Sequence, residues 1–250
     1  MALHRFFVTG EAPGAGVLGL TDADAHHLRD VLRLSAGDEI VVVDGIGAAI
    51  VRLDATTPDV TGTRIRRLPA RSIPRVTLAP ALAKSDKTDT VVRQATELGV
   101  ARIVPFAAER SVLRLEGAKG EVRAERWRRV AAEAAKQSQR VDVPVIVGPV
   151  RVADLPDALV GCTVLVCWED ASGAPGIGEA LERAAVSEDG EVAVVVGPEG
   201  GLTPGEVALL VEAGALPVSL GTTILRTETA AVVAAALALY ERGGLGAHGA

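Results

Sequence analysis

Two short segments near the carboxyl-terminal end of the chain have the residue types of ligand-binding loops. The first, Gly197-Pro198-Glu199-Gly200-Gly201, follows an apolar run and precedes Thr203-Pro204, which is typical of a helix start. Glycines let the backbone approach a ligand closely, and ligands of open α/β sheets bind where the strands end. This segment therefore predicts a binding loop, although an ordinary strand-to-helix turn would share these features.

The residues of this first loop favour a ligand without negative charge. The loop lacks the lysine and hydroxyl residue of a P-loop and the GxGxxG spacing of a dinucleotide site. It also carries Glu199, whose charge would repel a phosphate at the helix N-terminus. S-adenosylmethionine is a sulfonium cation with an adenosine moiety that needs backbone hydrogen bonds, and it fits this loop better than a nucleoside triphosphate.

The second segment, residues 220–230, also leaves a short predicted strand and enters a helix. We expect Thr227 to cap that helix and Glu228 to lie near its start, where the helix dipole favours an anion. Arg226 is the one basic residue between Arg183 and Arg242. It either pairs with an acidic neighbour for structural reasons or contacts the substrate, and the local pattern leaves both alternatives open.

The elements that must position these loops alternate along the chain after residue 74. Apolar runs predict strands at 75–79, 102–105, 163–168, 192–196 and 218–220, and helical patterns predict helices at 86–98, 121–139, 177–185, 204–213 and 228–242. Strands that alternate with helices indicate a parallel sheet covered on both faces. The fold class is therefore α/β for this part of the chain.

The first 70 or so residues predict a separate, β-rich module. Strands are expected at 5–9, 38–43 and 48–53, with a hairpin turn at Asp44-Gly45-Ile46-Gly47 and a helix at 22–34 capped by Thr21 or Asp22. Pro69 and Pro74 interrupt any regular element between the two parts. We therefore expect two domains, residues 1–72 and 73–250.

Charge is distributed unevenly along the chain. The formal net charge is −6, but it is −5 for residues 1–63, +10 for residues 64–140 and −11 for residues 141–250. A basic middle region is expected when one face meets a polyanion, and solvated helix faces would give the same totals. Along the helix predicted at 121–139, charged residues follow one another at three- and four-residue steps: Arg126, Arg129, Glu133, Lys136 and Arg140. This spacing by itself favours a solvated helix face with ion pairs.

The composition predicts a soluble, cytoplasmic protein. Hydrophobic residues make up 48% of the chain, yet no apolar run reaches the roughly 20 residues of a membrane span, and the first residues lack a signal-peptide pattern. Cys162 and Cys167 are five residues apart in one predicted strand, so they face opposite sides and are expected to be two reduced thiols. No clustered His or Cys completes a metal site.

Several segments together resemble the bacterial 16S ribosomal RNA (uridine-N3)-methyltransferases of the SPOUT superfamily. The resemblance runs from about Arg5 to Tyr240, and GPEGG followed by ILRTETA is its most specific part. In chain order the segments are Arg5-Phe6-Phe7-Val8, HHLRDVLRL at 26–34, Gly37-Asp38, TELG at 96–99, Glu109-Arg110-Ser111, Gln137-Ser138 with Arg140, GPEGG at 197–201 and ILRTETA at 224–230. Gln94 and Gln139 depart from the pattern, which has Lys and Gly there.

The resemblance implies a fold and partners that the local patterns do not. Residues 1–72 would form a PUA-like β-barrel that helps bind RNA, and residues 73–250 a parallel-sheet SPOUT methyltransferase domain with a trefoil knot. The protein would be a homodimer without a metal. It would use S-adenosylmethionine to methylate N3 of a specific uridine in 16S ribosomal RNA, on the 30S subunit.

The resemblance also implies which residues form the sites. Arg226 would stabilise the anion that forms as the uridine imide loses its proton, and Glu228 would orient Arg226 or assist proton removal. RNA is expected to be held mainly through its phosphates, because the chain has only six aromatic residues; the expected contacts are Arg5, His27, Arg33, Lys84, Arg110 and Arg140. The expected cofactor-binding residues are Glu169, Gly197, Pro198, Gly200, Gly201, Leu220, Gly221, Ile224 and Leu225.

Two other functions remain possible on the sequence. One is a non-catalytic RNA-binding factor in ribosome assembly with the same fold, against which the intact glycine loop and ILRTETA speak. The other is a nucleotide-dependent oxidoreductase or kinase, which the missing phosphate-loop residues disfavour. The residues alone leave open which nucleotide is modified, which group is the general base, and whether naked RNA or the assembled subunit is the substrate.

Overall fold

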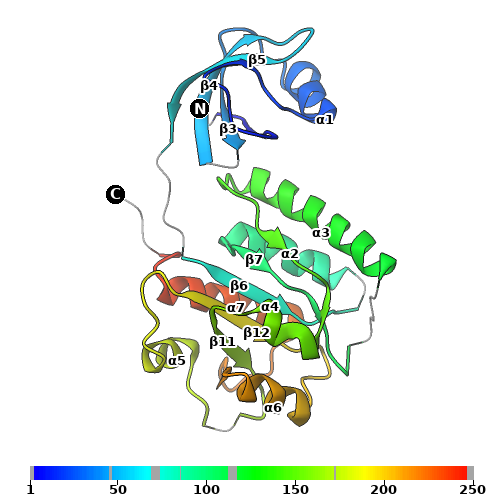
Figure 1. The fold of residues 1–250 in the computed structure, drawn as a ribbon, viewed down its shortest axis with the longest axis vertical. Coiled ribbons are helices and arrows are strands. Elements are labelled where there is room, and N and C mark those ends of the chain that lie inside the picture. Colours follow the sequence, from blue (N-terminus) through cyan, green and yellow to red (C-terminus); the bar gives the residue numbers. More distant parts are fainter. Residues whose placement is uncertain are drawn as a thin grey trace. The chain divides into compact units, whose positions relative to one another are not determined.

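The chain divides into two compact units (Figure 1). The computed structural model describes residues 3–44, 47–68, 74–84, 86–111, 117–171 and 173–246. Unit 1 comprises Met1–Ser72 and Ala135–Asp142, and unit 2 comprises Ile73–Ala134 and Val143–Ala250. The predicted boundary around 69–73 lies outside the described residues. Residues 135–142, which the sequence places in the second domain, group with unit 1.

Unit 1 is built on a five-stranded sheet. Alternate residues of its strands face two cores: Ile40 and Val42 pack with Phe6, whereas Val41 and Val43 pack on the other side. The predicted hairpin is confirmed, because Asp44 and Gly47 form the last pair of its ladder. The strand order is β1 (Arg5–Phe7), β3 (Glu39–Asp44), β4 (Gly47–Ala55), β5 (Thr61–Arg67) and β2 (Ala15–Val17), and all neighbours are antiparallel except β1 and β3.

The helix predicted at 22–34 is shorter and changes type. α1 (Asp22–His26) begins after Thr21, whose Oγ1 accepts a hydrogen bond from the amide of Asp24 at 3.1 Å, so the predicted cap is confirmed. A single π-helical turn, η1 (His27–Val31), follows. The helical pattern ends before Arg33, whose φ of 56° is left-handed. The HHLRDVLRL segment is therefore an irregular turn around the buried Leu28.

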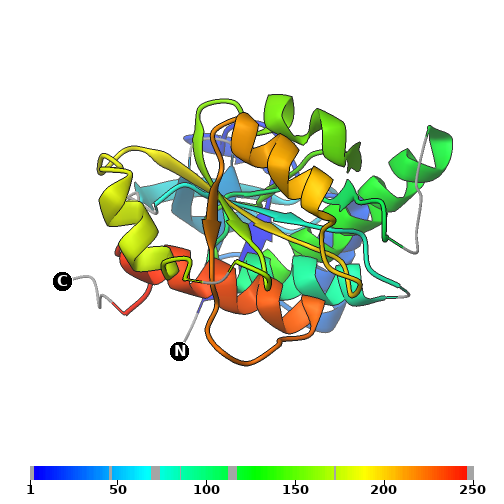
Figure 2. The ribbon, with the colours of Figure 1, turned by 90° about the horizontal axis from the view of Figure 1, so that it is seen from below.

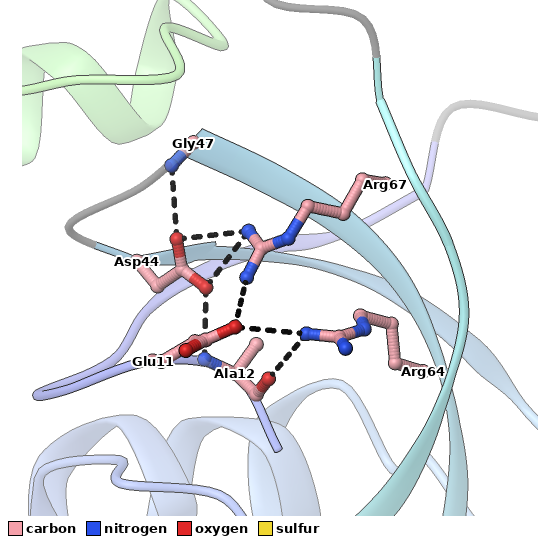
Figure 3. Close-up of polar contacts among 6 residues, drawn as sticks. All are labelled: Glu11, Ala12, Asp44, Gly47, Arg64 and Arg67. Atoms are coloured by element: carbon pink, nitrogen blue, oxygen red, sulfur yellow. Dashed lines mark hydrogen bonds and ion pairs between the residues drawn. The ribbon is translucent and has the colours of Figure 1, made fainter. Parts of the chain in front are cut away.

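A buried carboxylate ties the hairpin of unit 1 to its neighbours (Figure 3). Asp44 accepts hydrogen bonds from the amides of Ala12 at 2.8 Å and Gly47 at 2.9 Å, and it pairs with Arg67 at 3.0 Å. The hydrogen bond to Asp44 is the largest cause that raises the pKa of Arg67. Glu11 links Arg67 to Arg64, so one cluster joins β3, β4 and β5 to the segment before β2.

Unit 2 contains the predicted parallel sheet. Its two faces have separate cores: Val192, Val194 and Val196 of one strand face the first, whereas Ala193 and Val195 face the second. Such alternation of fully apolar residues is expected of a strand buried on both sides. The order, parallel throughout, is β13 (Leu216–Val218), β11 (Cys162–Cys167), β12 (Glu191–Val196), β6 (Val76–Pro80), β7 (Arg102–Ile103) and β9 (Val145–Ile146).

Helices cover both faces of this sheet, and Figure 2 shows α6 and α7 on opposite sides of it. The face of Val194 packs against α2 (Lys87–Leu98), α3 (Ala118–Gln137), α5 (Ile177–Arg183) and α7 (Thr227–Glu241). The opposite face packs against α4 (Leu155–Ala158) and α6 (Pro204–Glu212). The five helices predicted after residue 74 are therefore confirmed, with bounds shifted by a few residues.

Several short strands and helices are not predicted by the sequence patterns. They are β2 and β5 in unit 1, and β8 (Phe106–Ala107), β10 (Val150–Arg151), the 3-10 turn η2 (Val152–Asp154), α4 and β9 in unit 2. Segments of two to four residues are too short to show a period, and β5 has few apolar residues in its sequence TGTRIRR. Both cysteines are free, as expected. Within the described ranges, no helix has the length and apolarity to cross a membrane.

The end of α3 contains one departure from the family pattern, the glutamine at position 139. The amide of Gln139 bonds to the carbonyl of Lys136 and that of Arg140 to Ala135, which is a Schellman cap. Gln139 has the left-handed φ of 57° that this cap requires, and glycine adopts such a conformation without strain. The position therefore suits the glycine found in the family pattern better than the glutamine present here.

We predict that Gln139→Gly stabilises the protein. It relieves a left-handed penalty of about 1–2 kcal/mol, against a flexibility cost of glycine of roughly 0.5–1 kcal/mol, so the free energy of unfolding rises by up to about 1.5 kcal/mol. Chemical denaturation measures this change. The matched control is Gln94→Gly, within α2, which we expect to destabilise by about 1 kcal/mol. Equal losses at both positions would contradict the prediction.

Candidate functional site

Four neighbouring strands of unit 2 end in line. In the register of the sheet, Cys167 of β11 pairs with Val196 of β12 and with Val218 of β13, and Val196 pairs with Pro80 of β6. Each of these residues is the last of its strand. The loops that follow must therefore meet at one edge of the sheet, which is where open α/β sheets bind ligands.

A cavity lies at this edge, between the two loops singled out in the sequence. Eight of the nine predicted cofactor-binding residues line it: Glu169, Gly197, Pro198, Gly201, Leu220, Gly221, Ile224 and Leu225. The other lining residues are not expected from the sequence; they are Cys167, Trp168, Val196, Leu202, Ser219, Thr222, Thr223, Thr227 and Ala230. The parallel sheet thus joins segments that are more than 50 residues apart in the chain.

Glu169 and Gly201 show why glycine is needed on this wall. Gly201 has a left-handed φ of 70°, and a Cβ there would lie 2.7 Å from Oε1 of Glu169. The end of the Glu169 side chain would have to shift to admit a Cβ, and the left-handed φ by itself favours glycine, so the Glu169 carboxylate lies directly against the glycine loop. Its carboxylate oxygens supply hydrogen-bond acceptors to a cavity that is also lined by apolar side chains and by the hydroxyl residues Ser219, Thr222, Thr223 and Thr227.

Gly200, the ninth predicted residue, is not among the cavity-lining residues. It faces Arg110 instead: a Cβ at Gly200 would lie 3.2 Å from Cβ of Arg110, whose Nη1 donates to the Gly200 carbonyl at 2.7 Å. Arg110 is itself held through its neighbour, because the amide of Glu109 donates to Oε1 of Glu206 at 2.7 Å. The Glu109-Arg110-Ser111 motif therefore supports the glycine loop from outside the cavity.

Thr203 and Glu206 fix the far end of the same loop. Each side chain accepts a hydrogen bond from the other's backbone amide, at 2.8 Å for Glu206 Oε2 and 3.3 Å for Thr203 Oγ1. This capping box starts α6 with Pro204 in its first turn, as the sequence predicts. Glu206 therefore serves two segments, since its other carboxylate oxygen holds Glu109.

Lys87, at the first position of α2, contacts both chemistry-bearing loops. Its Nζ lies 2.9 Å from Oε1 of Glu199 and 3.3 Å from Oε2 of Glu228. The hydrogen bond to Glu199 raises the pKa of Lys87, burial opposes this, and Glu228 adds to the rise. Burial alone would raise the pKa of Glu199, but the bond from Lys87 and backbone amides, including that of Lys84, hold it below its ordinary value.

The ion pair of Glu199 corrects one step of the sequence argument. Glu199 does not line the cavity, and Lys87 balances its charge. The charge of Glu199 therefore gives no reason to prefer a cationic ligand over a phosphate. The argument for S-adenosylmethionine rests on the missing phosphate-loop residues and on the family resemblance.

Arg226 and Glu228 flank the cavity at the start of α7. The predicted cap is wrong: Arg226 is the N-cap residue, without a side-chain cap bond, and Thr227 is the first helical residue and buried. Within the part of the chain that the structure describes, the exposed Arg226 side chain makes no hydrogen bond or ion pair. Glu228 pairs with Lys87 rather than with Arg226, so neither structural pairing nor orientation by Glu228 accounts for Arg226.

The predicted RNA-binding residues divide into two groups. His27, Arg33, Lys84 and Arg110 are exposed. Arg140 is only 7% exposed and pairs with Asp142 at 2.8 Å, and Nη1 of Arg5 donates to the carbonyl of Arg140 at 2.7 Å. Burial lowers the pKa of Arg5. Arg5 and Arg140 therefore have partners within unit 1, as Arg110 has one in the carbonyl of Gly200, and the RNA contacts expected of all six residues stay predictions.

The charged stripe predicted on α3 is largely paired. Arg126 contacts Asp86 and Asp89, and Lys136 lies 2.8 Å from Asp24 within unit 1. Arg128, between them, contacts Glu121 and Glu125. The ion pairs that the spacing favours are thus confirmed for Arg126 and Lys136, whereas Arg140 lies after α3 and is only 7% exposed, so it is not part of a solvated face. Among the described residues, no group of three or more metal-ligating side chains occurs.

A wider groove of about 880 Å³ lies elsewhere in unit 2, next to the start of α3 and β10. Its arginines are engaged: Arg128 pairs with Glu121 and Arg151 with Asp154. Glu206, which also borders it, is occupied by the amides of Glu109 and Thr203. The smaller cavity at the strand ends is therefore the better candidate site, because there the two predicted loops and unpaired polar groups converge.

Comparisons with known proteins identify the family. A model described as an RNA methyltransferase domain matches residues 71–239, and one described as an RNA methyltransferase PUA domain matches residues 20–51. Ribosomal RNA small subunit methyltransferase E of Mycobacterium tuberculosis is 34% identical, with 91% of this chain and 88% of the relative covered. The chain belongs to the ribosomal RNA small subunit methyltransferase E family. The member from Bacillus subtilis is 32% identical, with 96% and 97% covered.

Solved structures of the family share the fold. The crystal structure of ribosomal RNA small subunit methyltransferase E from Neisseria gonorrhoeae, bound to S-adenosyl methionine, is 28% identical with a TM-score of 0.78, covering 94% of this chain and 96% of that one. A crystal structure described as a hypothetical protein reaches 0.84 at 29% identity, with 96% and 98% covered. The predicted PUA-like and SPOUT parallel-sheet domains are confirmed, and the knot stays a prediction.

We predict that Trp168 reports cofactor binding. The chain has two tryptophans: Trp127 is buried in the core of unit 2 and donates to Asp89 at 3.0 Å, whereas Trp168 lines the cavity. Adding S-adenosylmethionine should change the tryptophan emission, and Trp168→Phe should remove the change. Trp127→Phe is the control that keeps it. A response that persists in Trp168→Phe would place the cofactor elsewhere.

Proposed function

We propose that the protein transfers a methyl group from S-adenosylmethionine to N3 of a specific uridine in 16S ribosomal RNA of the small subunit. The observation that carries the proposal is the cavity where β13, β11, β12 and β6 end, formed by the two loops of a chain that belongs to this methyltransferase family. We further propose that the enzyme is cytoplasmic and that its substrate is the assembled 30S subunit.

The residues of the cavity fit S-adenosylmethionine. Leu220, Ile224 and Leu225 offer apolar contacts, and the glycine loop leaves backbone groups accessible. Trp168 lines the cavity with a buried Nε1 that has no hydrogen-bond partner among the described residues. A buried donor without a partner costs about 1–3 kcal/mol, so a ligand acceptor at this point is favourable. Glu169 provides the matching acceptor for hydroxyl or amino groups of a ligand.

Arg226 is the proposed electrostatic catalyst. The uridine imide must lose its N3 proton, and the negative charge that develops needs a fixed cation. Arg226 follows the cavity-lining Leu225 directly and has no competing partner within the described residues. When bound, S-adenosylmethionine supplies an electrophilic methyl group that N3 accepts as the bond from carbon to sulfur breaks.

Glu228 is the proposed proton acceptor. It lies in the first turn of α7, its Oε2 is buried, and Lys87 is its one described cationic neighbour. Orienting Arg226, the other role considered for Glu228, has no contact to support it. A carboxylate within one water or one hydrogen bond of N3 could take the proton as the methyl group arrives.

We expect Arg226→Ala to lower turnover by roughly 10²–10³-fold, because the variant loses the cation that stabilises the uridine anion. The cofactor affinity should stay almost unchanged, because Arg226 does not line the cavity. Labelled S-adenosylmethionine and purified 30S subunits measure the transfer, and mapping the labelled nucleotide tests the uridine assignment. Arg183→Ala is the control, since this exposed arginine of α5 pairs only with Glu179 among the described residues. Full activity of Arg226→Ala would contradict the role of Arg226.

The same assay separates the alternatives. A protein that binds 30S subunits but neither binds the cofactor nor transfers a methyl group would be the non-catalytic assembly factor. Naked 16S RNA in place of subunits shows whether the assembled particle is required. The homodimer implied by the family resemblance stays part of the proposal; Ile224, Leu237 and Tyr240 are exposed apolar side chains at or before α7 that such an interface could cover.

RNA binding should depend on exposed basic residues of each unit. Lys84, in the loop after β6, is exposed and its side chain makes no described contact. We expect Lys84→Gln to weaken 16S RNA binding and to reduce the slope of log K against log salt by about 0.7–0.9, the value for one lost phosphate contact. Arg151→Gln is the control, because Arg151 is held bidentately by Asp154. An unchanged slope for Lys84→Gln would remove it from the interface.

A further inference from the structure

Lys87 joins three elements that the chain brings together from distant positions. It begins α2, and its ammonium group contacts Glu199 in the loop after β12 and Glu228 in the first turn of α7. About a third of its side chain is exposed, at 36%, and Glu228 is more deeply placed at 23%. Glu199, from the glycine loop, and Glu228, from the first turn of α7, thus contact the same ammonium group.

None of these three side chains lines the cofactor cavity. The residues next to them do: Pro198 precedes Glu199, and Thr227 precedes Glu228. The bridge through Lys87 therefore lies behind the walls of the cavity. A change at Lys87 reaches the reaction through the placement of Glu228 and of the glycine loop, without removing any contact to the cofactor.

The charges of the bridge depend on Lys87. Without the ammonium group, Glu199 and Glu228 would be two carboxylates facing each other with no cation between them, and like charges repel. Glu199 has backbone amides, including that of Lys84, as further donors. Oε2 of Glu228 has no partner among the described residues other than the ammonium group of Lys87 at 3.3 Å, so Lys87 is what keeps this oxygen in place.

We propose that Lys87 is a positioning residue for methyl transfer, which holds the carboxylate of Glu228 beside the uridine site by bridging it to Glu199. This role rests on the proposed function, because Glu228 is the proposed proton acceptor. The raised pKa of Lys87 and the lowered pKa of Glu199 agree with a persistent ion pair between charged partners. Lys87 acts through Glu228 and touches neither substrate in this arrangement.

Lys87→Met tests the bridge, since it keeps most of the side-chain volume and removes the charge. We expect kcat to fall by about 10–100-fold, the scale for a displaced catalytic group, while the Kd for S-adenosylmethionine changes by less than about 3-fold. Lys87→Arg should recover most of the activity, because a guanidinium can contact two carboxylates. Lys119→Met, at an exposed lysine of α3, is the matched control and should be fully active.

A double-mutant cycle identifies the group through which Lys87 acts. In a Glu228→Gln background, Lys87→Met should cost little further activity, because its partner is already lost. If the losses of the two variants multiply, Lys87 does not act through Glu228. Equal losses in kcat and in cofactor affinity, with no recovery in Lys87→Arg, would show a purely structural role and overturn the proposal.

The outcomes for Lys87 are separable from those for the function as a whole. The tryptophan emission of each variant verifies that the cavity still binds the cofactor. A wild-type protein that transfers no methyl group contradicts the proposed function. An active wild type together with a fully active Lys87→Met contradicts the role of Lys87 alone.

Discussion

The common end point of four parallel strands is the constraint on which the site depends. Because Pro80, Val196, Cys167 and Val218 are paired in register, the segments after them emerge at one edge of the sheet. That register is fixed by the two cores, since a shift by one residue would exchange the faces of Val194 and Val195. Each loop can then be irregular and rich in glycine, because the sheet, and not the loop, determines where it begins.

Side chains outside the cavity hold in place the loops that follow these strands. Glu206 holds Glu109, Arg110 holds the carbonyl of Gly200, and Lys87 holds Glu199. These contacts leave the cavity itself with Glu169, the indole N–H of Trp168, backbone groups, apolar side chains and the hydroxyl residues Ser219, Thr222, Thr223 and Thr227. The protein thus separates loop support from ligand contact, so that the groups that meet the ligand are not also needed to hold the loop.

The sequence predicts features whose cause is local and misses those whose cause is distant. The Thr21 cap, the Asp44 turn and the helix start at Thr203-Pro204 follow from residues a few positions apart, and all are present. Lys87 escaped notice because its partner Glu199 is 112 residues away and its own surroundings look like an ordinary helix start. The charge of Glu199 was misleading for the same reason. The contacts of Arg5 and Arg140 were also missed, because they form only in the folded unit 1.

The contrast between Arg226 and the other cations near the site bears on mechanism. Arg110 donates to the loop backbone and Lys87 pairs with two carboxylates, whereas Arg226 makes no side-chain contact in the described part of the chain. A cation already paired with a carboxylate gains little from a new anion, because the existing bond must weaken first. An unpaired guanidinium on the N-cap residue of a well-packed helix loses only water when negative charge develops beside it. Glu228, the acidic residue in the first turn of α7, pairs with Lys87 and leaves Arg226 without an anionic partner among the described residues.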